Sequence, residues 1–160
     1  MSEMFIMELV IFIGLQASGK STFFRTHFAE THAYVSKDLL RSSKTMNKNA
    51  KQNKLVEDAL QMRRSVVIDN TNSTREDRES LIRLGHLYGA AVIGYYFEAS
   101  VRECLERNKG RVGKARVPDV AIYITSKKMS LPSYEEGFDA LFRVYIKGNG
   151  TFDVLDWKEE

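Results

Sequence analysis

The chain has 160 residues, of which 43% are hydrophobic and 28% are charged, and its formal net charge is +3. This composition is that of an ordinary globular protein, and the length fits a single domain over residues 1–160 with a sizeable core. The sole cysteine, Cys104, excludes an internal disulfide and predicts a reducing, cytoplasmic location, whereas the small net charge does not identify a partner.

The first predicted element is a strand near the start of the chain. Residues 4–15 are apolar apart from Glu8, are too short to span a membrane and follow no basic leader. We therefore expect neither a membrane span nor an export signal. Within this stretch, the continuous apolar run at 9–13 is typical of a central parallel strand that is covered on both faces.

A glycine-containing loop follows this strand, and residues 14–22 read G-L-Q-A-S-G-K-S-T. The spacing Gly14-x-x-x-x-Gly19-Lys20-Ser21 is that of a phosphate-binding loop. The two glycines permit backbone angles that turn successive N–H groups toward a phosphate. Lys20 would meet the outer phosphates of ATP, and the Ser21 hydroxyl would ligate Mg²⁺. A glycine turn that happens to precede Lys-Ser is the alternative.

A helix is expected over residues 20–29, so that its N-terminus lies at the loop. The positive end of the helix dipole would face the same anion. Ala17, Ser18 and Thr22 complete the predicted triphosphate-binding residues.

Strands and helices alternate along the rest of the chain. Apolar runs predict strands at residues 33–36, 65–69, 91–97 and 143–147, and residues 151–155 are a candidate for a short final strand. Helical patterns cover residues 53–64, 74–87 and 100–108. Ser73 and Ser100 are the expected helix caps, and Glu103 completes a capping box with Ser100. This alternation predicts an α/β fold with a mainly parallel sheet.

The most polar segment covers residues 42–53 and includes Lys44, Lys48 and Lys51. A mobile loop or a solvated helix face would explain this composition. The alternative is a surface that guides a phosphate backbone.

A first polar cluster, S-K-D-L-L-R at residues 36–41, directly follows the predicted strand at 33–36. In open α/β sheets, ligands bind beyond the carboxyl ends of the strands. Asp38 would there accept a proton from an attacking hydroxyl, and Arg41, one helical turn later, would bind a substrate phosphate. The alternative is that Asp38 caps a helix and pairs with Arg41.

A second cluster, V-V-I-D-N-T-N, occupies residues 66–72. Apolar residues that lead to Asp69 at a strand end form a Walker-B-like pattern, which suits the binding of Mg²⁺ or of its water. A plain turn from strand to helix is the alternative, and Asn70 and Asn72 would suit it.

A third cluster, residues 107–116, contains five basic residues, two glycines and no acidic residue. Arginines neutralise charge on a triphosphate, and glycines give a hinge its freedom. We therefore predict a lid over about residues 107–130. A surface loop with this composition by chance is the alternative.

Together these motifs resemble the 5′-kinase domain of polynucleotide kinases. The matching segments are G-L-Q-A-S-G-K-S-T at 14–22, S-K-D-L-L-R at 36–41, V-I-D-N-T-N at 67–72 with Arg78 after it, C-L-E-R-N-K-G-R at 104–111, V-P-D-V-A-I-Y at 117–123 and Y-E-E-G-F at 134–138. The similarity covers about residues 8–147. Many enzymes share the phosphate-binding loop, whereas the D-N-T-N and V-P segments are far more particular.

The resemblance implies a P-loop NTPase fold. Its sheet would have five mainly parallel strands flanked by helices, with the loop strand at the centre and a lid above. Asp38 would be the general base that activates a 5′-hydroxyl, and Arg41 would contact the phosphate beside that hydroxyl.

The resemblance also implies roles on the floor and in the lid of the site. Asp69 and Thr71 would lie at the floor of the acceptor site. Arg107 and Arg111 match lid positions that meet the triphosphate, and Arg111 would stabilise the transferring phosphoryl group.

The predicted function is therefore an ATP- and Mg²⁺-dependent kinase whose acceptor is a 5′-hydroxyl of DNA or RNA, as used in nucleic acid repair. One alternative is a kinase of a sugar, nucleoside or nucleotide-sugar, which would share Lys20, Ser21 and Asp38. The other is an ATP-binding module without transfer activity. A placed base at Asp38 speaks against that module.

Overall fold

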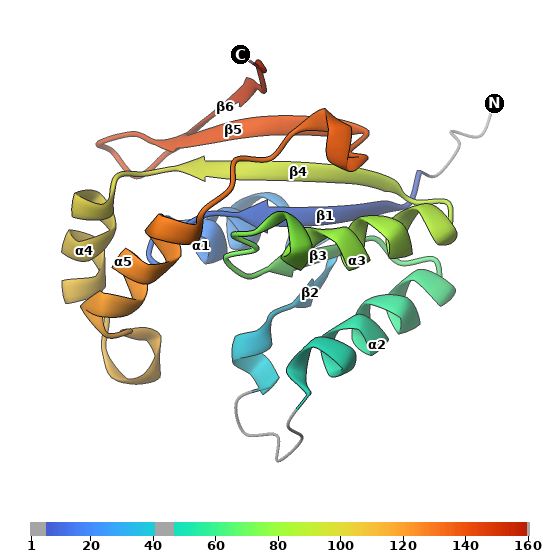
Figure 1. The fold of residues 1–160 in the computed structure, drawn as a ribbon, viewed down its shortest axis with the longest axis horizontal. Helices are drawn as coiled ribbons and strands as arrows, with labels where there is room; N and C mark the ends of the chain where they lie inside the picture. Colours follow the sequence, from blue (N-terminus) through green and yellow to red (C-terminus); the bar gives the residue numbers. More distant parts are fainter. Residues whose placement is uncertain (1–5, 41–46, 160) are drawn as a thin grey trace.

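The computed structural model describes residues 6–40 and 47–159, and a sheet of six strands forms its centre (Figure 1). The strands lie in the order β2-β3-β1-β4-β5-β6. Their bounds are β1 (Glu8–Ile13), β2 (Ala33–Val35), β3 (Val66–Asp69), β4 (Ala91–Glu98), β5 (Ala140–Ile146) and β6 (Phe152–Asp156). Neighbours from β2 to β5 pair in parallel, whereas β6 runs antiparallel to β5.

The expected parallel core is confirmed, with β1 in the middle of its five strands. The sheet has one strand more than the five expected. A turn closed by the hydrogen bond from Lys147 N to Thr151 O folds the chain back on β5 and forms this sixth strand. The candidate final strand is β6, which begins at Phe152.

Five α-helices are described: α1 (Lys20–His27), α2 (Lys48–Gln61), α3 (Arg75–Leu87), α4 (Val101–Lys109) and α5 (Asp119–Lys128). Three short 3₁₀ turns are η1 (Lys37–Leu40), η2 (Gly113–Ala115) and η3 (Tyr134–Glu136). The capping box of Ser100 and Glu103 at α4 is confirmed.

Two helix starts differ from expectation. Helix α2 begins five residues before position 53, because the Asn47 side chain accepts a hydrogen bond from Ala50 N and caps it. The cap of α3 is Thr74 and not Ser73, since Asp77 at the third helical position completes a capping box with Thr74.

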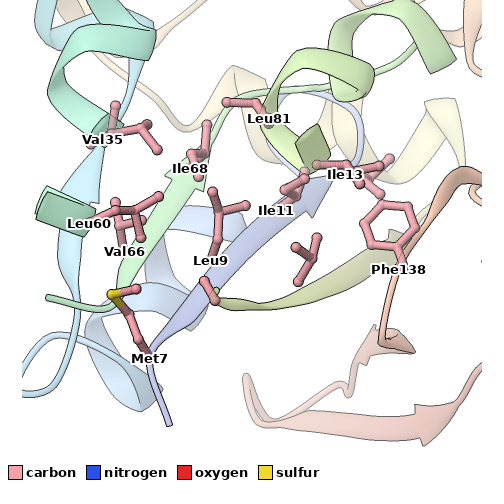
Figure 2. Packing of buried hydrophobic residues seen from close by; sticks show 14 of the residues in the cluster. Met7, Leu9, Ile11, Ile13, Val35, Leu60, Val66, Ile68, Leu81 and Phe138 are labelled. Atoms are coloured by element: carbon pink, nitrogen blue, oxygen red, sulfur yellow. The ribbon is translucent and has the colours of Figure 1, made fainter. Parts of the chain in front are cut away.

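Helices cover both faces of the sheet (Figure 1). On one face, Leu60 of α2 and Leu81 of α3 pack with alternate residues of β1 and β3, as Figure 2 shows. On the other face, Phe23 and Phe24 of α1 pack against Phe12 of β1. All residues of β1 from Leu9 to Ile13 are therefore inaccessible to solvent, as the continuous apolar run predicts.

Helices α4 and α5 lie beyond the carboxyl ends of β1 and β4 (Figure 1). They pack through a small apolar cluster made of Leu15, Ala17, Cys104 and Ile122. Cys104 is fully buried there. This cluster holds the two helices against the loop that follows β1. Among the described residues, none of the helices combines the length and the apolar character that crossing a membrane requires.

Candidate functional site

The glycine-rich loop joins β1 to α1 and is held by its backbone. Gly14 N donates a hydrogen bond of 3.0 Å to Thr71 O, which ties the loop to the segment after β3. A side chain at Gly14 would place its Cβ 2.9 Å from Phe97 Cβ. Gly19, at the start of α1, has a φ of 97° in the left-handed region, where glycine is favoured. Ala17 also has a positive φ, of 64°, so this loop stores backbone strain.

Lys20 is folded onto the loop that precedes it. Its Nζ donates to Leu15 O at 2.6 Å and to Gly14 O at 3.0 Å, and it lies 3.4 Å from Ser18 Oγ. Burial lowers the pKa of Lys20 to about 8, although the nearby Asp69 carboxylate acts in the opposite direction. The ammonium is thus held at the loop and has little water around it.

Asp69 accepts hydrogen bonds from two hydroxyls. Ser21 Oγ donates to Asp69 Oδ2 at 2.9 Å, and Tyr34 Oη donates to the same oxygen at 2.6 Å. Burial, together with the nearby Asp69 carboxylate, raises the pKa of Tyr34 to about 12. Ser21 and Asp69 were predicted from the sequence to lie at a magnesium site, whereas Tyr34 was not.

The pair of Ser21 and Asp69 fits a magnesium ion by its chemistry. A serine hydroxyl and a carboxylate are oxygen donors, which Mg²⁺ prefers. Among the described residues, no group of three or more His, Cys, Asp or Glu side chains could hold a metal ion by itself. Binding at this pair would therefore depend on nucleotide phosphates and water for the remaining ligands.

Asp38 lies on η1, immediately after β2, and is exposed to solvent. Its backbone N donates to Ser36 Oγ at 3.2 Å. The preceding Lys37 N donates to Asn70 Oδ1 at 2.9 Å, which connects η1 to the segment after β3. The two predicted clusters at these strand ends are therefore neighbours in space. Arg41 lies outside the described residues.

A cavity of about 410 Å³ opens at this end of the sheet. The predicted site residues that line it are Ala17, Ser18, Lys20, Ser21, Asp38, Asp69, Thr71 and Arg111. Thr22 is not among them, because its side chain is exposed and accepts a hydrogen bond from Arg25. Arg107 stands beside the loop instead, where its Nη1 donates to Ala17 O at 3.4 Å.

Five further polar residues line the cavity although the sequence did not predict them as site residues: Gln16, Lys37, Asn70, Asn72 and Asp77. Gln16 lies within the loop motif and Lys37 is adjacent to Asp38, so the motifs could have predicted that these two residues line the cavity. Asp77 lies in the first turn of α3, and only the fold brings it to the cavity.

The predicted lid contains the end of α4, a basic loop with η2, and α5. Buried Asn108 closes the base of this loop, because its side chain accepts from Val117 N and donates to Val117 O. Arg111 Nη1 donates to Ala115 O within the loop. Of the two glycines expected to act as hinges, Gly113 has a positive φ of 60°, whereas Gly110 has an ordinary helical conformation.

Buried Arg78 of α3 connects η3, the end of the predicted lid and the segment after β3. Arg78 is inaccessible to solvent and binds both carboxylate oxygens of Glu136, at 2.8 and 3.1 Å. Its Nη1 also donates to Asn72 O and to Ser130 O. Arg78 therefore holds the segment that follows α5 in place.

The profile of the AAA domain family matches residues 9–129. The chain belongs to this family. The match includes the phosphate-binding loop, the segment after β3 and most of the predicted lid.

Two curated relatives are kinases by name. The bifunctional polynucleotide phosphatase/kinase of Schizosaccharomyces pombe is 28% identical over 145 residues, which are 88% of this chain and 34% of that protein. The L-seryl-tRNA(Sec) kinase of Methanococcus maripaludis is 28% identical over 144 residues, which are 82% of this chain and 56% of that protein. The resemblance to polynucleotide kinases is thereby confirmed, while the chain spans only part of the length of either relative.

Among solved structures, Kti12 of Chaetomium thermophilum, in complex with ADP-AlF3, has a TM-score of 0.67 at 16% identity. The likeness covers 89% of this chain and 92% of that chain. It supports the predicted α/β fold, in agreement with the family match.

Proposed function

We propose that the protein is an ATP- and Mg²⁺-dependent kinase that phosphorylates the 5′-hydroxyl end of DNA or RNA. The observation that carries this proposal is the lining of one cavity by both halves of a transfer site. Lys20 and Ser21 of the phosphate-binding loop face the same space as Asp38 from the end of β2. A module that only binds ATP would not need a carboxylate opposite the loop.

The donor half would hold the triphosphate. Backbone N–H groups of the loop and the Lys20 ammonium would bind its phosphates. Ser21 and Asp69 would hold Mg²⁺, which neutralises phosphate charge when it is bound. Asp69 would also keep the Ser21 hydroxyl oriented, because it accepts its hydrogen bond.

The acceptor half would activate the attacking hydroxyl. The oxygen of the acceptor hydroxyl forms a bond to the γ-phosphorus of ATP, while the bond from that phosphorus to the β–γ bridging oxygen breaks. The hydroxyl proton passes to the Asp38 carboxylate, and ADP leaves. Arg111, from the lid, would neutralise charge on the transferring group. Exposure of Asp38 in the open cavity is compatible with this role, because closure of a lid would exclude water.

The acceptor class rests on the resemblance in the acceptor half. The S. pombe relative is named a polynucleotide phosphatase/kinase, and its match covers 88% of this chain. Basic residues of the lid loop also suit a phosphate backbone. A second candidate is a kinase of a smaller or different acceptor, favoured by the comparable identity to the M. maripaludis L-seryl-tRNA(Sec) kinase.

A labelling panel tests the proposal. The protein is incubated with γ-labelled ATP and Mg²⁺ and is offered 5′-hydroxyl DNA and RNA oligomers, 5′-phosphorylated oligomers, nucleosides and sugars. We expect label on the 5′-hydroxyl oligomers alone, and none with Lys20→Met. Label on metabolites only would overturn the polynucleotide assignment. ATP binding without label on any acceptor would overturn transfer itself.

Salt dependence separates a polynucleotide acceptor from a neutral metabolite. For single strands, the logarithm of the affinity should fall with the logarithm of the salt concentration by about 0.7 for each phosphate contact. Binding of a neutral metabolite should change little over the same range. An oligomer whose affinity is unaffected by salt would speak against a site built for a polynucleotide.

A further inference from the structure

One oxygen of the Asp69 carboxylate receives two hydroxyl donors from different elements. Oδ2 accepts from Ser21 on α1 at 2.9 Å and from Tyr34 on β2 at 2.6 Å. Asp69 is only 5% exposed, so water competes little for these bonds. Among the described residues, no hydrogen-bond partner is found for the other oxygen, Oδ1, and Asp69 lines the cavity.

The register of the sheet explains why Tyr34 reaches Asp69. Tyr34 is paired with Val67 in the parallel pairing of β2 and β3. Asp69 is two residues beyond Val67, so the three side chains share one face of the sheet. Helix α1 covers this face. The phenol therefore extends along the face toward the start of α1, where Ser21 is placed.

The Tyr34 ring is itself held in place. Its centroid is 4.5 Å from that of Phe24, one helical turn after Ser21 on α1. Phe24 belongs to the buried cluster between α1 and the sheet. The packing of the ring thus fixes the position of the Tyr34 hydroxyl. A hydrogen-bond donor in a fixed position restricts the rotation of the carboxylate that it contacts.

We propose that Tyr34 is a positioning residue for the nucleotide–Mg²⁺ site: its hydroxyl locks the Asp69 carboxylate so that Oδ2 orients Ser21 while Oδ1 faces the cavity. This rests on the proposed function for the identity of the ligand. Groups that orient a metal-binding side chain influence metal affinity without touching the metal. The geometry gives Tyr34 that relation to both Ser21 and Asp69.

The test measures nucleotide binding and not transfer. ADP is titrated calorimetrically into the wild type and into Tyr34→Phe, once with saturating Mg²⁺ and once with EDTA. The phenylalanine keeps the ring packing and removes the hydroxyl. We expect the enhancement of ADP affinity by Mg²⁺ to fall roughly 10-fold, at the lower end of the range for orienting groups around metals. Affinity in EDTA should stay within about 2-fold of wild type.

Tyr95→Phe is the matched control. Tyr95 lies on β4 in the same aromatic cluster, with its ring centroid 6.0 Å from that of Phe12. In the described part of the chain its hydroxyl makes no hydrogen bond to Ser21 or Asp69. We expect this variant to keep the full Mg²⁺ enhancement. An equal loss in Tyr34→Phe and Tyr95→Phe would overturn the proposal, because it would reflect general damage to the cluster.

A double-mutant cycle tests whether Tyr34 acts through Asp69. Asp69→Asn should lose most of the Mg²⁺ enhancement, and adding Tyr34→Phe to it should cause little further loss. Additive losses would overturn the proposed route, as would an unchanged enhancement in Tyr34→Phe. Since no step requires an acceptor, absence of transfer to every acceptor would refute the proposed function and leave this test valid.

Discussion

The Gln16 side-chain amide donates a hydrogen bond of 3.0 Å to the hydroxyl of Thr125, and this bond joins the phosphate-binding loop directly to helix α5 of the predicted lid. Thr125 is buried, and its hydroxyl donates in turn to Ala121 O. The other amide atom, Gln16 Oε1, is buried without a hydrogen-bond partner among the described residues. The contact thus couples the loop to the lid.

Thr125→Val should loosen this attachment, because valine keeps the shape and removes the acceptor. A hydrogen bond contributes about 0.5–1.5 kcal/mol, which corresponds to roughly 2- to 13-fold faster opening. Hydrogen exchange of the α5 amides, measured by mass spectrometry without ligand, should accelerate by that factor. Ser126→Ala on the same helix is the control. Exchange equal to wild type in Thr125→Val would show that the bond does not hold the lid.

The donor half of the site could be predicted because adjacent residues carry it. The glycines, Lys20 and Ser21 of the loop follow one another between a buried strand and a helix, so local spacing is enough. The contact of Tyr34 with Asp69 could not be predicted, because it depends on the register of β2 against β3. The two-residue alternation of side chains along a strand predicts the face of the sheet on which Tyr34 lies. It does not predict which residue of the neighbouring strand Tyr34 contacts.

Arg78 shows a second limit of the sequence. A charged residue in a polar helix is expected to be exposed, yet Arg78 is fully buried beside Glu136. The two residues are 58 positions apart, so no local pattern connects them. Only the path of the chain from α5 to η3 brings Glu136 beneath α3. By contrast, the capping box of Ser100 and Glu103 is local and was predicted correctly.

Glu136→Gln should destabilise the protein strongly. Both members of its ion pair are almost completely buried, with side-chain exposures of 0% and 3%. Removal of one partner from a buried pair leaves an uncompensated charge and costs about 3–5 kcal/mol. The decrease should be visible as a lower free energy of unfolding in urea.

The adjacent Glu135 provides the control for this experiment. Its ion pair with Arg75 is longer, at 3.7 Å, and the side chains are 80% and 53% exposed. Such a pair contributes roughly 0–1 kcal/mol, so Glu135→Gln should unfold nearly as wild type does. Similar losses for the two variants would refute the role of the buried pair.

ATP affinity should fall as the pH rises through the pKa of Lys20. In the ligand-free protein this pKa is about 8, because burial disfavours the charged ammonium. Phosphates would restore a high pKa, so binding requires the proton. From pH 7 to 9 the charged fraction declines from about nine-tenths to one-tenth, and affinity should weaken about 10-fold. Calorimetry with a non-hydrolysable ATP analogue at constant ionic strength measures this, and Lys20→Met should remove the dependence.

The same shift has the opposite effect on the stability of the ligand-free protein. The folded-state pKa of Lys20, about 8, lies below its ordinary value of 10.5. Between these values the unfolded chain binds more protons, so this residue makes the free energy of unfolding rise with pH across that window. Comparison of urea unfolding at pH 8 and pH 10 in wild type and Lys20→Met isolates the contribution. A larger rise in the variant than in wild type would contradict the direction.

Asp38→Asn should separate catalysis from nucleotide binding. If Asp38 takes the proton of the acceptor hydroxyl, its loss should lower kcat by roughly 10²–10⁴-fold, the usual contribution of a general base. Asp38 is exposed and lies outside the phosphate-binding loop, so the affinity for the ATP analogue with Mg²⁺ should remain near that of wild type.

Asp77 provides the control, because it lines the same cavity and its replacement by asparagine removes an equal charge. Asp77→Asn should retain kcat within about 3-fold, since it has no proton to accept. Single-turnover transfer to the acceptor found in the labelling panel measures both variants. A full rate in Asp38→Asn, or equal losses in the two, would show that the cavity needs negative charge and not a base at Asp38.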